Sequence, residues 1–204
     1  MKRHRPRQSC STSDENFQVS IARVKREQLI SQAEGYLDLI VACGEICMLD
    51  EHLQFELAEK SLDCLSQLDE SSGRRAHVLY LKGQAHRLCH RYDLAVEMFE
   101  AALDFDSNNV HIYLSLGWCY KRVGNLTAAI TALEDALDVE PNSGIVNYNL
   151  ACYWALANHP NTAVKFLSRA FDLDHRYRDL IADESDFDKI RNHPAFLAVT
   201  TVIV

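Results

Sequence analysis

Residues 110–143 read VHIYLSLGWCYKRVGNLTAAITALEDALDVEPNS, and this stretch decides the fold because the chain repeats its pattern on both sides. Residues 76–109 and 144–177 carry similar side chains at matching places, which gives a period of 34 residues. Small residues occupy places where two helices must approach closely, and large apolar residues fill the space beside them. The pattern is carried by Leu79, Gly83, Ala95, Phe99 and Ala102, then Tyr113, Leu116, Gly117, Tyr120, Ala129, Leu133, Ala136 and Pro141, then Asn147, Leu150, Ala151, Trp154, Ala163, Leu167 and Ala170.

Each block is predicted to form two antiparallel helices joined by a short polar turn. In the middle block, Gly124 can adopt a left-handed conformation at the end of one helix, and Asn125 can cap the next. Pro141 follows the second helix and helps to end it. One helix pair cannot bury its apolar face alone, so the pairs are expected to stack into a curved solenoid whose concave wall consists mainly of first helices.

The period and the pattern resemble those of tetratricopeptide repeats (TPRs). The resemblance implies an all-α fold, a right-handed TPR superhelix in which antiparallel helix pairs form an α-solenoid, with repeats at 76–109, 110–143 and 144–177. The end of the chain, with its acidic-Phe-Asp stretch followed by an arginine and by His-Pro-Ala-Phe, is similar to the ends of many bacterial TPR proteins. Residues 178–204 are therefore expected to form a C-terminal helical cap, with short helices that begin near Ser185 and at Pro194.

The first part of the chain carries a weaker pattern. Residues 1–15 are predicted to be a disordered basic arm, and residues 16–75 a divergent helical lead-in or degenerate TPR. Two repeat phases remain open for the lead-in. One takes residues 32–37 as part of a first TPR helix, whereas the favoured one places a turn at 50–52 and a second helix at 55–68. The charges of the basic arm come from Lys2, Arg3, Arg5 and Arg7.

Composition narrows the function classes. The formal net charge of −8 argues against general nucleic-acid binding, which requires a basic face. No stretch approaches the roughly 20 apolar residues of a membrane helix, and the basic start lacks the apolar run of a signal peptide. The seven cysteines have no close-spaced framework, so they are interpreted as reduced thiols in a cytoplasmic protein.

No motif indicates catalysis or a cofactor: the sequence has no Gly-rich phosphate loop, no His-Glu-x-x-His and no paired Cys-x-x-Cys. The strongest metal candidate is the set His86, Cys89 and His90, since the two histidines are four residues apart and share a helical face. A structural role explains the same three residues. Cys43 and Cys47 are also four apart, but both fit an apolar helix stripe. A metal- or redox-responsive regulator therefore remains an alternative function, and no metal ligand is assigned.

Binding of a protein or peptide is the function that the resemblance implies, because TPR domains generally hold their ligands on the first helices. Arginine and aromatic side chains among these positions are typical interface anchors. The positions that carry over from the family are His77, Tyr80, Gln84, Arg87, His111, Leu114, Trp118, Lys121, Arg122, Tyr148, Asn149 and Cys152.

Some TPR domains clamp the acidic tails of heat-shock chaperones with a fixed set of Lys, Asn and Arg residues. None of the five corresponding positions here, Tyr80, Gln84, Ser115, Ile145 and Asn149, carries the required residue type. The sequence thus predicts a non-catalytic scaffold or adaptor that binds a peptide or protein segment in the concave TPR groove by a different mode. The alternative within binding is a small TPR chaperone that shields an apolar segment of a client.

Overall fold

The computed structural model describes residues 11–46, 50–68 and 74–201, with side chains described from residue 18 onward except at 44–46. Every regular element in these ranges is an α-helix or a 3₁₀-helix. The chain divides into two compact units, with the boundary at Gly73, and each unit is described by itself. The five cysteines in the described ranges are free thiols.

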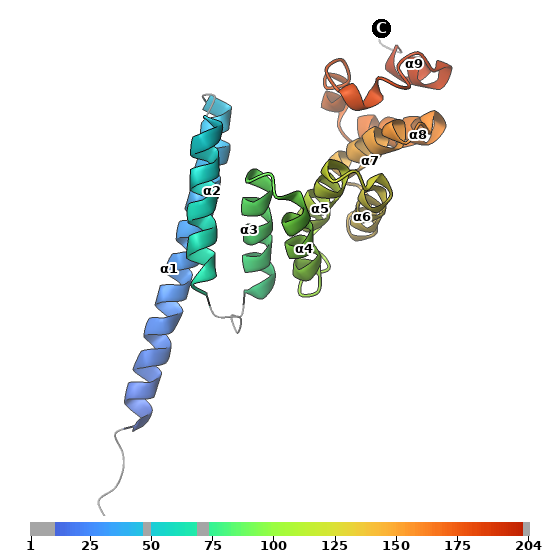
Figure 1. Ribbon diagram of the computed structural model, residues 1–204. Helices are drawn as coiled ribbons and strands as arrows, with labels where there is room; N and C mark the ends of the chain where they lie inside the picture. The colour runs from blue at the N-terminus through green and yellow to red at the C-terminus, as the bar shows by residue number, and fades with distance from the viewer. Residues whose placement is uncertain (1–10, 47–49, 69–73, 202–204) are drawn as a thin grey trace, which may run out of the picture. The chain divides into compact units, whose positions relative to one another are not determined.

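The first unit is an antiparallel pair of helices, α1 (Ser11–Ile46) and α2 (Glu51–Ser66) (Figure 1). The helices approach closely where small side chains meet, since Ala33 and Ala58 are completely buried. At this crossing the Ser61 hydroxyl donates a hydrogen bond of 3.1 Å to the Ala33 carbonyl oxygen. The larger buried side chains of the pair are Leu29, Ile30, Leu37, Ile40, Leu57 and Leu65.

The structure corrects the predicted boundaries of this first unit. Residues 11–15, which were assigned to a disordered arm, form the beginning of α1, whereas residues 1–10 lie outside the described residues. Helix α1 also continues through Ile46, so residues 32–37 lie inside one long helix. Helix α2 begins directly after Asp50, earlier than the predicted range of 55–68.

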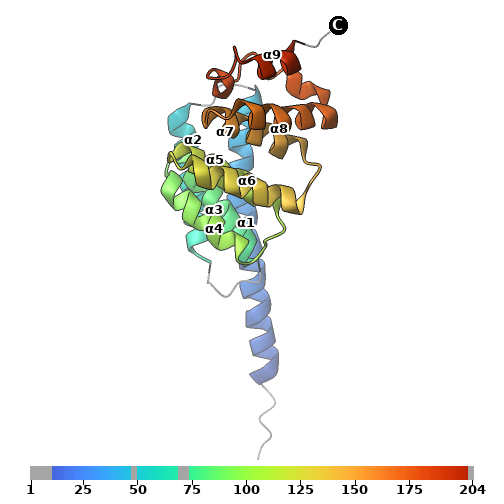
Figure 2. The same cartoon turned by 90° about the vertical axis from the view of Figure 1, so that its right-hand side faces the viewer.

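The second unit contains three helix pairs in succession (Figures 1 and 2). The pairs coincide with the 34-residue blocks, except that α3 begins one residue before its block, so the period corresponds to one pair of helices. The pairs are α3 (Arg75–Leu88) with α4 (Tyr92–Leu103), α5 (Val110–Arg122) with α6 (Leu126–Val139), and α7 (Gly144–Leu156) with α8 (Pro160–Leu173).

A left-handed residue ends the turn region within each pair. Gly124 has a φ of 84°, as predicted, and the equivalent positions in the other two pairs are His90 at 57° and Asn158 at 60°. The side chain of Asn125 accepts a hydrogen bond of 3.1 Å from the backbone nitrogen of Ala128, which confirms the predicted cap. The turn geometry is therefore conserved through all three pairs even though only one of them uses glycine.

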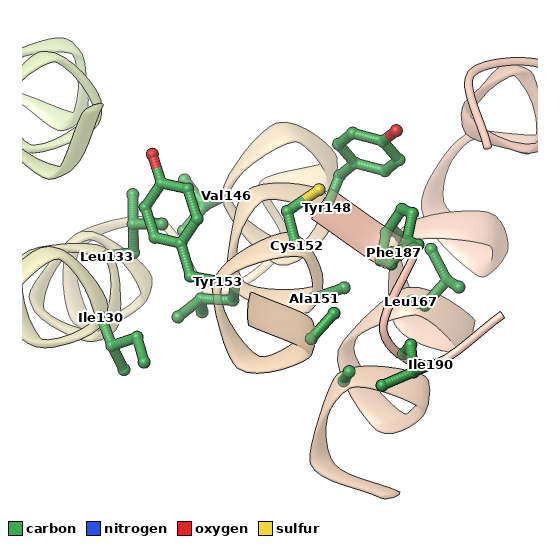
Figure 3. Packing of buried hydrophobic residues seen from close by; sticks show 14 of the residues in the cluster. Ile130, Leu133, Val146, Tyr148, Ala151, Cys152, Tyr153, Leu167, Phe187 and Ile190 are labelled. Atoms are coloured by element: carbon green, nitrogen blue, oxygen red, sulfur yellow. The ribbon is translucent and has the colours of Figure 1, made fainter. Parts of the chain in front are cut away.

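The core of each pair is set by a small residue that faces a large one. An added Cβ at Gly83 would lie only 2.5 Å from the Phe99 ring, and one at Gly117 would lie 3.2 Å from Leu133. The third pair uses Ala151 in the core with Leu167 (Figure 3). Within each helix pair, the size of the small residue on the first helix thus matches the size of the large residue on the second helix.

The chain ends in a cap that packs on α7 and α8. It consists of η1 (His175–Arg178), η2 (Ser185–Phe187) and α9 (Pro194–Thr200), of which η2 packs on α7 and the other two on α8. Helix α9 begins at Pro194 as predicted, whereas the helix expected near Ser185 is a single 3₁₀ turn. The side chains that anchor the cap in the core are Ile181, Phe187, Ile190 and Phe196.

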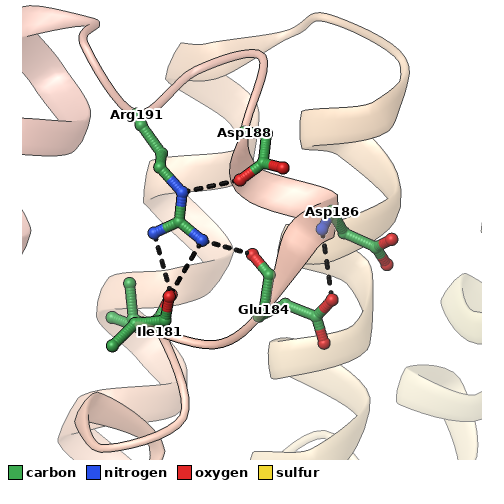
Figure 4. A network of polar contacts seen from close by, with 6 residues as sticks. Ile181, Glu184, Asp186, Asp188 and Arg191 are labelled. Carbon is green, nitrogen blue, oxygen red and sulfur yellow. Dashed lines mark hydrogen bonds and ion pairs between the residues drawn. The ribbon is translucent and has the colours of Figure 1, made fainter.

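Arg191 holds the loop that carries η2 (Figure 4). Its guanidinium donates to the carbonyl oxygens of Ile181 at 3.0 Å, Ala182 at 3.2 Å and Glu184 at 2.7 Å. Its Nε also donates to the Asp188 carboxylate at 2.7 Å. One side chain therefore fixes both ends of this loop and presents Glu184 and Asp186 toward α7 in a defined conformation.

Candidate functional site

The first helices of the three pairs, α3, α5 and α7, follow one another and form one wall of the second unit, which we call the first-helix face (Figure 2). Side-chain contacts join each of them to the next. Gln84 Nε2 of α3 donates to Ser115 Oγ of α5 at 3.1 Å. Lys121 Nζ of α5 lies 5.4 Å from the ring centroid of Tyr153 on α7. These contacts fix the spacing of functional side chains across the wall.

On α3, three predicted site residues form a hydrogen-bonded row. Gln84 Nε2 donates to the Tyr80 hydroxyl at 2.6 Å, and Gln84 Oε1 accepts from Arg87 Nε at 2.8 Å. The three residues are three or four apart in sequence and therefore lie on one side of the helix. Gln84 and Ser115 occupy two of the positions that clamp-type TPR domains use for ligand binding, and here the two side chains bond to each other.

Two arginines surround one tryptophan at the boundary between α3 and α5. Arg87 Cζ and Arg122 Cζ lie 5.3 Å and 5.5 Å from the Trp118 ring centroid, which is within cation–π range. The Tyr92 ring meets Trp118 edge to face, with 5.6 Å between centroids, and Arg122 Cζ lies 5.2 Å from the Tyr92 centroid. We call these four residues, Arg87, Tyr92, Trp118 and Arg122, the Trp118 cluster.

Tyr92 was missed by the sequence analysis, which considered first helices only. It is the first residue of α4, and its hydroxyl lies 2.7 Å from His90 Nδ1 and 3.4 Å from Arg122 Nη2. An open cavity of about 480 Å³ adjoins it, lined by residues 90–94 with Arg122 and Val123. An aromatic residue directly after a predicted turn is the signal that could have identified it.

Lys121 faces away from the Trp118 cluster, although it precedes Arg122 in sequence. Its ammonium forms an ion pair with the carboxylate of Asp186 in the cap. Asp186 is only 7% exposed. The predicted groove cation is therefore already neutralised by the protein's own C-terminal segment, and it marks the place where the cap reaches the first-helix face.

The cap covers the first-helix face of the third pair. The Tyr148 ring stacks on Tyr177 with 5.2 Å between centroids. It also meets Phe187 edge to face at 6.0 Å (Figure 3). Tyr148 and Cys152 are 5% and 2% exposed, so neither of these predicted site residues presents its side chain to solvent. Burial raises the pKa of both groups, the Tyr148 phenol and the Cys152 thiol.

The other predicted positions do not join the Trp118 cluster. His77 and His111 lie in the first turns of α3 and α5, and only His111 is well exposed. Leu114 is partly buried against the core around α7, and Asn149 is partly buried on α7 itself. The structure thus brings together Tyr80, Gln84 and Arg87 with Trp118 and Arg122, and the remaining members of the predicted set lie outside this group.

Metal-ligating side chains gather in one place within the described ranges. The ligand atoms of Cys152, Glu184 and Asp186 all lie within 4.8 Å of one another. The predicted candidate set is arranged differently. Cys89 is buried at the end of α3, and the exposed His90 contacts Tyr92 through its ring nitrogen. Cys43 is half-buried on α1, and Cys47 lies outside the described residues.

Comparison with known proteins identifies repeats of the expected kind. Residues 90–147 match the tetratricopeptide repeat family model. Over 85 residues, 42% of this chain, the sequence is 28% identical to the anaphase-promoting complex subunit CDC16 of Saccharomyces cerevisiae. It is 26% identical over 118 residues, 56% of this chain, to superkiller protein 3 of Schizosaccharomyces pombe. The matches cover 10% and 8% of those two proteins, so the chain spans about a tenth of their length.

Similar solved structures include two of MamA. A crystal structure of MamA has a TM-score of 0.57 and 16% sequence identity, over 86% of this chain and 99% of that one. MamA from Desulfovibrio magneticus RS-1 has a TM-score of 0.53 and 15% identity, over 71% and 96% of the two chains. At these identities the likeness concerns the fold. Among the helices of the described residues, none has the length and apolar character required to cross a membrane.

Proposed function

Because the chain is a tetratricopeptide repeat protein, we propose that it is a non-catalytic scaffold that binds a peptide or protein segment on the first-helix face of its first two repeats. TPR solenoids generally serve protein–protein interaction. The observation that carries the proposal is the Trp118 cluster, in which two arginines and two aromatic rings meet at the surface between α3 and α5. Arginine, tryptophan and tyrosine are the residues that most often anchor interfaces.

The chemistry of the cluster favours an acidic ligand. A guanidinium that lies over an aromatic ring keeps its edge available for a carboxylate, which it can bind through two parallel hydrogen bonds. Arg122 is exposed and Arg87 is half-buried, so the two arginines combine accessibility with a fixed position. In a protein with a formal net charge of −8, this concentration of positive charge also disfavours basic segments. The cluster therefore supports an acidic ligand better than the apolar client of a chaperone.

The cap limits the proposed site to the first two repeats. On α7 the predicted ligand positions Tyr148 and Cys152 are covered, and on α5 Lys121 is occupied by Asp186. The ligand path that remains runs along α3 and α5, from Tyr80 through Gln84 and Arg87 to Trp118 and Arg122. A short linear segment fits such a path.

A charge reversal at Arg122 tests this proposal. Peptides selected from a random display library on the wild-type protein are expected to be enriched in Asp and Glu. We expect Arg122→Glu to weaken their binding about tenfold or more, because it replaces an anchoring cation with a repelling charge. Dissociation constants of selected, fluorescently labelled peptides can be measured by anisotropy. Trp118→Ala is expected to weaken the same peptides to a similar extent.

Lys165→Glu is the matched control, since Lys165 is an exposed cation on the second helix α8, and the change in net charge is the same. Lys165→Glu should bind the selected peptides with dissociation constants within about twofold of the wild-type values. Circular dichroism should show that all variants are folded. Equal binding of the selected peptides by wild type, Arg122→Glu and Trp118→Ala would remove the cluster from the site. Selection of basic or apolar peptides would instead contradict the proposed ligand class.

A further inference from the structure

Cys152, Glu184 and Asp186 form a cluster that lies between the third repeat and the cap. Cys152 lies on α7, Glu184 is the N-cap residue of η2, and Asp186 lies within η2. The three ligand atoms lie within 4.8 Å of one another, and Cys152 and Asp186 are 2% and 7% exposed. A thiolate and two carboxylates are a donor set that Zn²⁺ accepts.

A second observation points to a ligand at the same place. Tyr148 lies one helical turn before Cys152 on α7 and is 95% buried, since its exposed fraction is 5%. Its hydroxyl has no hydrogen-bond partner of acceptable geometry in the described part of the chain. Residues four apart share one face of a helix, so the Tyr148 side chain lies beside that of Cys152. After burial, the neighbours that raise the pKa of this phenol are Cys152, Glu184 and Asp186. A buried hydroxyl of this kind normally bonds to a protein group, a water or a ligand.

The cluster has an excess of negative charge and a fixed shape. Lys121 forms an ion pair with Asp186, which sets one ammonium against two carboxylates. Glu184 accepts a hydrogen bond of 3.1 Å from the backbone nitrogen of Asp186, and Arg191 binds the Glu184 carbonyl oxygen at 2.7 Å (Figure 4). The carboxylates therefore stay together without a movement of the loop, and a divalent cation would offset the charge that Lys121 leaves.

We propose that Cys152, Glu184 and Asp186 bind one Zn²⁺ ion, which fastens the C-terminal cap to the third repeat. Binding forms one sulfur–zinc bond and two oxygen–zinc bonds and releases the thiol proton of Cys152 to solvent. Zinc–ligand bonds of about 2.0–2.3 Å require only small side-chain movements from the observed separations. The fourth position is left to a water molecule, which can donate a hydrogen bond to the Tyr148 hydroxyl oxygen.

Titration with Co²⁺, a spectroscopic substitute for Zn²⁺, tests the site in the full chain purified without a His-tag and stripped by a chelator. We expect a thiolate-to-cobalt charge-transfer band in the near ultraviolet that saturates at one equivalent and disappears on addition of one equivalent of Zn²⁺. Cys152→Ser should abolish the band. Glu184→Gln alters a half-buried residue and should keep the fold but weaken cobalt binding at least about tenfold.

Cys119→Ser is the matched control, because Cys119 is a completely buried thiol on α5. It should retain the band, and Cys64→Ser on α2 provides a second control should Cys119→Ser not fold. The absence of a band from the folded wild type would overturn the proposal. A band that survives in Cys152→Ser but is lost from Cys89→Ser would place the metal at the end of α3 and would overturn it as well.

Discussion

Phe187→Ala is expected to lower the free energy of unfolding of the repeat unit by about 3–5 kcal/mol, the usual cost of truncating a fully buried phenylalanine. Phe187 is 0% exposed and contacts Tyr148 and Phe196, with 6.0 Å and 5.3 Å between ring centroids. It is the main apolar link between η2 and α7. Because η2 is a single 3₁₀ turn, it has little helical stability of its own with which to resist the loss.

Urea denaturation followed by circular dichroism measures this effect. Phe105→Ala is the matched control, because Phe105 is 53% exposed and its truncation should change the free energy of unfolding by less than about 1 kcal/mol. A loss of less than about 1 kcal/mol in Phe187→Ala would show that the cap contributes little to the stability of the third repeat. The covering of Tyr148 and Cys152 would then have to be attributed to other residues.

Gly83→Ala is expected to destabilise the first repeat by about 1–3 kcal/mol, although alanine is the better helix former. The added methyl group would lie 2.5 Å, 2.7 Å and 2.8 Å from three carbon atoms of the Phe99 ring. Phe99 is completely buried and also contacts Tyr80, with 5.8 Å between ring centroids. The ring therefore cannot move aside without disturbing the core and the α3 residues that hold Arg87.

The repeat itself supplies the controls for Gly83→Ala, and urea denaturation again provides the measurement. Gly117→Ala should be much milder, because the equivalent contact with Leu133 is 3.2 Å and the third repeat already has alanine at this place. Phe99→Leu should cost less in the Gly83→Ala background than in wild type, with a coupling free energy of about 0.5–3 kcal/mol. Additive effects of the two substitutions would exclude the proposed clash.

Much of this fold follows from the sequence because its determinants are local and recur every 34 residues. The all-α TPR solenoid is confirmed by the matches to TPR proteins, and the predicted roles of Gly124 and Asn125 are confirmed by their geometry. These features depend on residues within one helix turn of each other. The first unit lacks such a period, and there the start of α1 and the start of α2 were placed incorrectly.

The candidate site was less predictable because its decisive contacts join distant parts of the chain. Lys121 and Asp186 are 65 residues apart, and no local pattern connects them. The position of Lys121 on a first helix predicted a contact with a ligand, but in the structure Lys121 forms an ion pair with Asp186 of the cap. The contact between Tyr92 of the second helix α4 and Trp118 could not be predicted for a similar reason, since it depends on how neighbouring helix pairs stack. The position of a residue in the repeat thus predicts whether it lies on the first-helix face, but it does not predict whether the cap covers that residue.

Enclosure of α7 changes which end of the solenoid opens first. Eight of its thirteen residues are buried, and it is packed against α6, α8 and η2. In a linear array the terminal repeat has a neighbour on one side only and frays, so its amide hydrogens exchange early. Here the cap supplies the missing neighbour. The amides of α7 are therefore expected to be among the last to exchange with deuterium, which makes the C-terminal end the slow-opening end of the array.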